Sequence, residues 1–273
     1  MSLQSRVQNL QSKIFLPWLD VLALLAWGGL LFRYWITGQL RLLIHPNYFW
    51  LVLLTSMALL ILGILKVIQI VADWRKQEAN SEARETVQHI TLFPPGIGSG
   101  VLVVTALAGF LVGPTVLTSQ VALQRGVTES LPITRSQPQS FRTTTKPEER
   151  SLIDWIRTLN AYPEPDAYAG QKAKVTGFVV HLPHLPENYL LISRFIITCC
   201  AVDAYPVGIP VKLESSRNAY PPDTWLEIEG EMMVETLPLD EQTLTETSSE
   251  KRQLILAAKS LQQIPTPADP YSY

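Results

Sequence analysis

Three long apolar stretches lie within the first 117 residues of this 273-residue chain. Residues 15–32 contain one charged side chain, Asp20, whereas residues 49–65 and 96–117 contain none. A helix rises about 1.5 Å per residue, so about 20 apolar residues cross the roughly 30 Å hydrocarbon core of a bilayer. The pattern predicts three transmembrane helices, at residues 15–32, 49–68 and 96–117.

The rest of the chain contains no stretch of this kind, which predicts a soluble C-terminal domain. We expect the following organisation: a membrane domain over residues 1–118, a polar linker over 119–146, a folded domain over 147–265 and a tail over 266–273. The last 148 residues contain 13 Lys/Arg and 19 Asp/Glu, and an acidic domain repels phosphate backbones. We therefore expect no nucleic-acid partner.

Basic residues near the predicted spans indicate their orientation, because cytoplasmic loops are enriched in lysine and arginine. Six basic residues flank the membrane on the N-terminal side and four on the opposite side. The six are Arg6, Lys13, Lys66, Arg75, Lys76 and Arg84, and the four are Arg33, Arg41, Arg125 and Arg135. The bias predicts a multi-pass protein of the cell membrane with a cytoplasmic N-terminus and an extracytoplasmic C-terminal domain.

Asp20 lies inside the first apolar stretch, where an ionisable side chain has two interpretations. Charged groups within a bilayer often mark a functional pathway. Pro17, however, favours a helix start, which would place Asp20 in the first turn, near the headgroups and the positive end of the helix dipole. We expect the second arrangement.

Small residues recur at spacings of four in the third stretch. Gly96 and Gly100 form one pair, and Gly109 and Gly113 form another. This spacing lets two helix backbones approach closely. The partner is either another span of the same chain or a helix of another protein.

The segment after the linker predicts one short helix followed by five strands. An acidic first turn at Pro147–Glu149 precedes an apolar stripe over residues 152–159. Alternating apolar residues then predict strands at residues 172–181, 189–200, 209–214, 225–234 and 252–261. Five short antiparallel strands favour a small OB-like barrel, with a small sandwich as the alternative. The fold class expected is therefore an α+β membrane protein.

The densest group of chemically active side chains is Cys199, Cys200 and Asp203. Thiolates favour soft metals such as copper(I) and zinc, so a possible cofactor is a soft metal ion. In a straight strand, however, Cys199 would point into the core and Cys200 away from it. Only a bulge or turn between Cys200 and Asp203 could gather the three. Three interpretations stay open: a structural core cysteine, a soft-metal ligand set, and thiol redox chemistry.

Two histidines, His181 and His184, flank Pro183 in the loop after the first predicted strand. They could complete a metal site with the cysteines, or they could simply lie in a surface loop. The sequence contains no Ser/His/Asp grouping, phosphate-binding glycine loop or paired carboxylates in an apolar setting. We therefore expect no enzymatic activity and no catalytic residues.

Several segments resemble a family of accessory subunits of two-component permeases. In the N-terminal half these are residues 37–46, Gly113-Pro114 and Arg125-Gly126-Val127. In the C-terminal half they are residues 170–179 and 194–208, the latter containing the pattern R-F-x-x-x-C-C-x-x-D-A that starts at Arg194 and Phe195. The resemblance covers nearly the whole chain and includes that family's C-terminal domain of unknown function.

The resemblance implies an accessory membrane subunit encoded beside a multi-span permease. Many members of the family have a histidine-rich stretch between spans two and three. Residues 73–94 of this chain contain a single histidine there, His89, which weakens a metal-delivery role for that loop. The departure leaves the Cys199, Cys200 and Asp203 group unaffected.

These observations support three hypotheses of function. The first is a non-enzymatic permease subunit whose extramembrane barrel captures, gates or senses the solute. The second is a membrane-anchored domain that uses Cys199 and Cys200 for soft-metal binding or thiol redox chemistry. The third is a structural tether whose barrel binds a protein ligand along a strand edge.

Overall fold

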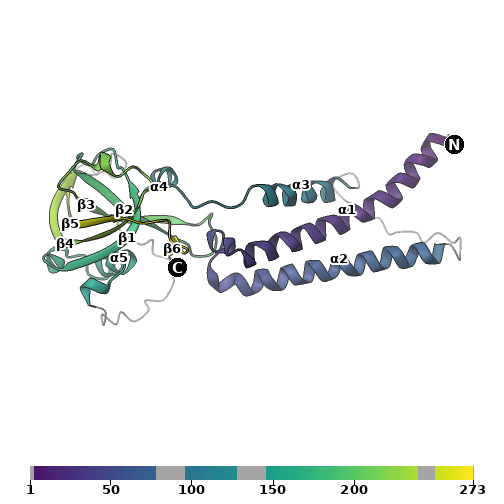
Figure 1. Cartoon of the computed structure of the whole chain (residues 1–273), viewed down its shortest axis with the longest axis horizontal. Helices are drawn as coiled ribbons and strands as arrows, with labels where there is room; N and C mark the ends of the chain where they lie inside the picture. Colours follow the sequence, from purple (N-terminus) through teal and green to yellow (C-terminus); the bar gives the residue numbers. More distant parts are fainter. Residues whose placement is uncertain (1–2, 78–95, 128–145, 239–249, 273) are drawn as a thin grey trace. The chain divides into compact units, whose positions relative to one another are not determined.

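The structure is a computed structural model that describes residues 3–77, 96–127, 146–238 and 250–272 (Figure 1). The chain divides into two compact units, Met1–Thr115 and Val116–Tyr273. The first unit is helical and the second contains a six-stranded sheet, so the α+β class is confirmed.

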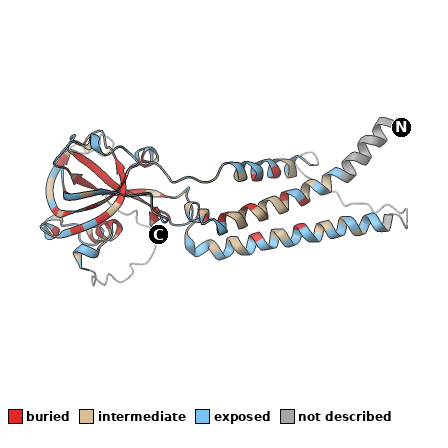
Figure 2. Cartoon of the chain, in the orientation of Figure 1, coloured by how far each residue is buried: buried red, intermediate tan, exposed pale blue. Residues whose placement is uncertain are grey.

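The N-terminal unit contains three α-helices: α1 (Leu3–Ile36), α2 (Phe49–Gln77) and α3 (Ile97–Leu111). Two short 3₁₀ helices, η1 (Gln39–Leu42) and η2 (Pro46–Tyr48), join α1 to α2. Two stretches, Phe15–Ile36 and Pro46–Arg75, are long and apolar enough to cross a membrane. Their surfaces are mostly exposed or half-buried within the unit, as Figure 2 shows, so most of their apolar side chains remain available to lipid or to another helix.

The third predicted span, residues 96–117, is helical only over the 15 residues Ile97–Leu111. Such a helix is about 22 Å long and does not by itself cross a hydrocarbon core of roughly 30 Å. The chain becomes extended at Val112, just before Gly113 and Pro114. Proline disfavours the helical conformation in the residue before it, so the helix ends here although the apolar composition continues.

The C-terminal end of α3 is held against α1 by polar side chains. The Tyr34 hydroxyl donates to the Gly109 carbonyl at 2.7 Å, and Arg33 Nη1 donates to the Phe110 carbonyl at 2.8 Å. The Arg33 guanidinium also lies over the Phe110 ring, 5.6 Å from its centre. These contacts satisfy carbonyl groups that the end of a helix leaves without an intrahelical partner.

The expectation that Asp20 lies in the first turn of its helix was wrong. The helix α1 begins at Leu3 and continues through Pro17, so Asp20 lies well within it. Its carboxylate is 2.5 Å from Lys66 Nζ of α2 and accepts a hydrogen bond from the Ser99 hydroxyl of α3. A polar group inside an apolar bundle therefore has partners on both neighbouring helices, as the cost of leaving a charge without a partner requires.

The four glycines that were expected to mediate helix packing differ in their surroundings. A Cβ atom at Gly109 would lie 2.7 Å from Leu30 Cδ2, and one at Gly96 would collide with Leu16. Both glycines therefore face α1 of the same chain. Gly113 lies against the Gln39 side chain, whereas a Cβ atom at Gly100 would meet nothing within 4 Å.

The C-terminal unit contains two α-helices, α4 (Ser119–Arg125) and α5 (Leu152–Ala161), and three 3₁₀ helices, η3 (Pro147–Glu149), η4 (Pro165–Tyr168) and η5 (Arg217–Ala219). Its strands are β1 (Lys172–Val180), β2 (Tyr189–Ile196), β3 (Tyr205–Lys212), β4 (Trp225–Pro238), β5 (Glu250–Gln263) and β6 (Tyr271–Ser272). The sheet order is β1-β4-β5-β3-β2-β6, and β1 also pairs with β2. Only the β3–β5 and β2–β6 pairs are parallel among the described strands.

The core of this unit lies between α5 and the sheet, where buried residues concentrate in Figure 2. Helix α5 begins with a capping box, because the Ser151 and Asp154 side chains each bond to the other's backbone N–H. Its apolar face, with Trp155 fully buried, packs on the inner faces of the strands. The buried strand residues in this cluster include Val175, Leu190, Ile192, Ile209, Ile228 and Leu256.

Two segments that we expected to lie outside the folded domain form part of it. The predicted linker 119–146 begins with α4, in which Ser119 and Ala122 are buried; its residues 128–145 lie outside the described residues. The predicted tail 266–273 contains β6, whose buried Tyr271 pairs with Phe195 of β2. Both segments are too short for a sequence period to indicate them, and tertiary contacts stabilise them.

The row of glutamates along β4 faces outward, and each of its three carboxylates pairs with a lysine. Lys174 Nζ lies 2.8 Å from Glu227 and 2.9 Å from Glu229, and Lys259 Nζ lies 2.7 Å from Glu231. Cross-strand pairs of opposite charge support the β1–β4–β5 register.

The β4–β5 pairing predicts a position that tolerates no side chain. Gly230 lies at a register shift, and a Cβ atom there would collide with the carbonyl group of Ala257, at 2.9 Å from its carbon. We expect Gly230→Ala to lower the free energy of unfolding by about 2 to 3 kcal/mol, because the backbone must shift. Urea unfolding of the detergent-solubilised chain measures this. The exposed Ser260→Ala on β5 serves as the control, and equal stability of the two variants would contradict the packing described.

Candidate functional site

The two cysteines lie in the connection between β2 and β3, not in a strand. Strand β2 ends at Ile196 and β3 begins at Tyr205, so the expectation that a strand extends to Cys200 and buries Cys199 was wrong. Cys199 is exposed, and Cys200 and Asp203 are half-buried. The chain instead makes a tight turn in which the Asp203 N–H donates to the Cys200 carbonyl at 3.0 Å.

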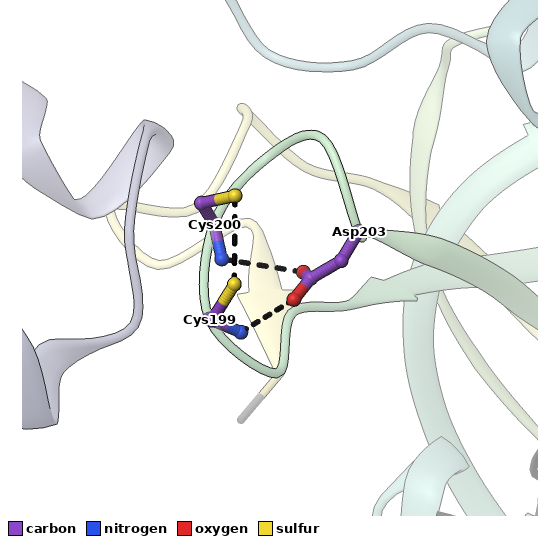
Figure 3. Close-up of side chains that lie close together, drawn as sticks. All are labelled: Cys199, Cys200 and Asp203. Atoms are coloured by element: carbon purple, nitrogen blue, oxygen red, sulfur yellow. Dashed lines mark hydrogen bonds between the residues drawn. The ribbon is translucent and has the colours of Figure 1, made fainter.

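This turn gathers the group that the sequence singled out. One ligand atom from each of Cys199, Cys200 and Asp203 lies within 4.8 Å of the other two. The two sulfur atoms are 3.6 Å apart, and both cysteines are free thiols (Figure 3). We define Thr198–Asp203 as the thiol turn.

The Asp203 carboxylate determines the shape of the thiol turn. Its Oδ2 accepts from the Thr198 hydroxyl at 2.6 Å and from the Cys199 N–H at 2.7 Å. Its Oδ1 accepts from the N–H groups of Thr198 and Cys200, each at 3.3 Å. An ionised carboxylate offers about four lone-pair positions, so these donors use its accepting capacity. Asp203 is therefore better suited to hold the turn in place than to coordinate an ion directly.

The hydrogen bonds change the acidity of both groups. Although partial burial raises the pKa of Asp203, its bonds from the Cys199 and Thr198 side chains and from two backbone N–H groups lower that pKa to about 2. Because the folded pKa is depressed from 3.8, this stabilising contribution is complete above about pH 4 and is lost as the pH falls toward 2. The same carboxylate, with a smaller contribution from Cys200, raises the pKa of the Cys199 thiol to about 12.

The two histidines are not part of this group. His181 Nε2 lies 2.9 Å from the Tyr220 carbonyl, and His184 is half-buried in the same loop between β1 and β2. That loop precedes β2, whereas the thiol turn follows it. A strand of eight residues is about 25 Å long, so the histidines and the thiols lie at opposite ends of β2.

Arg194 and Phe195 of the sequence motif stabilise the strand next to the thiol turn. Arg194 Nη2 donates to the Asp269 carbonyl at 2.7 Å, and the guanidinium lies over the Trp225 ring, 5.6 Å from its centre. Phe195 is fully buried and stacks on Phe178, with ring centres 5.4 Å apart. These contacts fix the C-terminal residues against β2.

Two residues at this site, Arg125 and Thr198, were missed as functional candidates. Arg125, the last residue of α4, donates from Nη1 to the Ala201 carbonyl at 3.3 Å and to the Ala204 carbonyl. Thr198, which bonds to Asp203, was also not singled out. Sequence reasoning used Arg125 only within the resemblance of Arg125-Gly126-Val127 and in the count of basic residues, because the polar composition around it indicated a linker.

Comparison with known protein families assigns both halves of the chain. Residues 19–128 match the DUF1980 N-terminal domain, and residues 142–273 match the DUF1980 C-terminal domain. The chain carries both DUF1980 domains. No curated protein matches it. The thiol turn therefore belongs to the DUF1980 C-terminal domain, and the two apolar helices that could span a membrane belong to the N-terminal half.

The arrangement predicts how Asp203 affects the thiol. In a Cys200→Ser background, which isolates Cys199, we expect Asp203→Asn to lower the pKa of Cys199 toward the ordinary thiol range. Alkylation by iodoacetamide at pH 8 should then accelerate at least about tenfold, because each pKa unit changes the thiolate fraction about tenfold.

The control for this measurement is Thr198→Ala in the same background. It removes one hydrogen bond to the carboxylate and keeps the negative charge, so alkylation should remain slow. Identical dependence of the alkylation rate on pH with and without Asp203 would contradict the electrostatic explanation.

Proposed function

We propose that this DUF1980 protein is a non-enzymatic accessory subunit of a membrane permease and that its C-terminal domain binds a soft metal ion at the thiol turn. The observation that carries the proposal is the placement of two free thiols within 3.6 Å of each other, on an exposed turn of a domain linked to apolar helices. The metal ion is then the solute that the domain captures or senses for the permease.

We infer that the N-terminal unit crosses the membrane three times. The helices α1 and α2 are each long enough, and α3 with the extended residues 112–115 spans a comparable length. An odd number of crossings places the N-terminus and the C-terminal domain on opposite sides. Lys66 and Arg33 bind to groups within the helical unit, so we leave both out of the count of basic residues that flank the membrane. Five basic residues then remain on the N-terminal side and three on the opposite side, which keeps the bias toward a cytoplasmic N-terminus.

We infer that the sheet of the C-terminal unit is an OB-type barrel. The pairings β1–β4, β4–β5, β5–β3, β3–β2 and β2–β1 form a ring of five strands, with β3 and β5 parallel. A closed barrel leaves few free strand edges, which weakens the hypothesis of a tether that binds a protein ligand along an edge. The proposed function rests on the thiol turn and not on this fold, because one fold supports many functions.

The donor set favours an ion with few ligands. Asp203 already accepts four hydrogen bonds, so the thiols of Cys199 and Cys200 are the donors best placed to coordinate an ion. Structural zinc sites use four protein ligands, whereas copper(I) combines softness with low coordination numbers. We therefore propose that the turn binds copper(I) preferentially and zinc more weakly.

Thiol redox chemistry fits the same residues less well. Reactive cysteines have a lowered pKa, because the thiolate is the nucleophile. The pKa of Cys199 is instead raised by the Asp203 carboxylate. A cation reverses this disadvantage, because it stabilises the Cys199 thiolate that the carboxylate disfavours.

The proposed role predicts association with a permease. When the chain is co-expressed with the multi-span protein encoded beside it, we expect the two to co-purify in mild detergent. The Cys199→Ser/Cys200→Ser double variant should co-purify equally well, because association depends on the apolar helices. Recovery of this chain alone under the same conditions would contradict the subunit proposal.

The proposed metal site predicts binding that depends on the thiols. The full chain in detergent should bind about one equivalent of copper(I) in competition with a chelator, and zinc(II) more weakly. Affinity should rise with pH, since coordination releases thiol protons. The Cys199→Ser/Cys200→Ser variant should lose this copper(I).

A matched double variant, His181→Ala/His184→Ala, serves as the control for the metal measurement. It should bind copper(I) like the unmodified chain, because both histidines lie at the other end of β2. Equal copper(I) content in the chains with and without cysteines would remove the metal proposal.

A further inference from the structure

The segment that leads into the C-terminal domain is attached to it by specific contacts. The Leu117 N–H donates to the Tyr271 hydroxyl at 2.9 Å, and the Ser119 N–H donates to Asp223 Oδ1 at 2.5 Å. Ser119 and Ala122 of α4 are buried in the domain. Residues 116–125, which follow α3 in the chain, are therefore an integral part of the domain.

Helix α4 depends on these contacts for its stability. It has seven residues, far fewer than the 12 to 15 or so that an isolated helix needs to be even marginally stable in water. The helix ends at Arg125, and Gly126 directly after it adopts a positive φ of 74°. Loss of its contacts with the domain would therefore unfold α4 as well as release it.

Arg125 and Asp203 hold complementary parts of the thiol turn. Asp203 accepts from the N–H groups of the first half, at Thr198, Cys199 and Cys200. Arg125 donates to carbonyl groups of the second half, at Ala201 and Ala204. The geometry of the two thiols thus depends on α4 as well as on the turn's own carboxylate.

We propose that Arg125 is a positioning residue of the metal site and that it couples metal binding to the docking of residues 116–125. The coupling rests on the proposed binding of a soft metal at the thiol turn. With α4 docked, Arg125 keeps the turn in the form that presents both sulfur atoms together. With α4 released, the Ala201 and Ala204 carbonyls lose this donor and the turn is freer to change.

Coupling of this kind is reciprocal. If docking of α4 tightens metal binding by some factor, metal binding must favour the docked segment by the same factor. Residues 116–125 directly follow the extended residues after α3, so the ion changes the state of the chain segment that joins the domain to the helices. The two states differ in defined contacts, which gives the coupling a physical basis.

The test uses the full chain in detergent, with copper(I) delivered by a chelator as the probe. We expect copper(I) to slow amide hydrogen exchange in residues 116–125 about tenfold in the unmodified chain. Arg125→Met should weaken copper(I) binding about tenfold and abolish this added protection. Arg125→Lys keeps the charge and one donor group, so it should restore part of both effects.

The matched control is Arg217→Met. Arg217 Nη1 also donates to two loop carbonyls, those of Leu182 and Leu185, but in the loop at the other end of β2. Its replacement should change neither copper(I) affinity nor the exchange of residues 116–125. This control distinguishes a general effect of removing an arginine that supports a loop from the specific effect of removing the arginine at the thiol turn.

The outcomes distinguish this inference from the metal proposal beneath it. Thiol-dependent copper(I) binding without added protection of residues 116–125 would overturn the coupling alone, as would unchanged affinity in Arg125→Met. Absence of thiol-dependent copper(I) binding in the unmodified chain would overturn both proposals. If Arg125→Met fails to fold, exchange in the unmodified chain with and without copper(I) still decides the coupling.

Discussion

Backbone groups at the ends of helices and strands need hydrogen-bond partners, and this requirement explains the most informative contacts in both units. Buried N–H and C=O groups without partners are costly, so side chains satisfy those that the regular elements leave free. At the end of α3, Arg33 and Tyr34 of α1 bind two carbonyls. At the end of β2, Asp203 binds three N–H groups and Arg125 binds two carbonyls. In each case the charged or polar residue determines how the chain leaves a regular element.

The features that depend on hydropathy and alternation could be predicted from the sequence. Apolar length indicated α1 and α2, and the alternation along residues 225–234 indicated β4. The same criteria failed where the backbone conformation decides the outcome. Residues 96–117 are apolar throughout, yet the helix stops before Gly113 and Pro114. Residues 197–199 continue the alternation of β2, yet the N–H groups of Thr198 and Cys199 donate to Asp203 instead of to a strand, and side-chain bonds to the backbone leave no periodic signal.

Contacts between distant parts of the chain account for the rest of what the sequence did not reveal. Arg125 binds the carbonyl of Ala204, which lies 79 residues further along the chain, and Tyr271 accepts from Leu117, 154 residues away. Composition described the segments around Arg125 and Tyr271 as a linker and a tail, because local sequence cannot indicate which tertiary partner a short segment will find. The group formed by Cys199, Cys200 and Asp203 could be named from the sequence, but its assembly required a turn that the sequence left open as one possibility beside a straight strand.

The electrostatics of the thiol turn depend on the carboxylate of Asp203, which lies beside the two adjacent cysteines. Without a cation, Asp203 holds the Cys199 proton firmly, so the exposed thiol resists alkylation and oxidation, which proceed through the thiolate. In the proposed metal site, a soft cation that displaces the proton of Cys199 would also offset the negative charge that disfavours its thiolate. The same carboxylate would then disfavour the Cys199 thiolate in the empty turn and favour it once an ion is bound. Within the turn, Val202 is 85% exposed and Cys199 is exposed, whereas Cys200 is half-buried. If the proposed ion binding holds, an exposed site of this kind suits capture and transfer better than permanent storage.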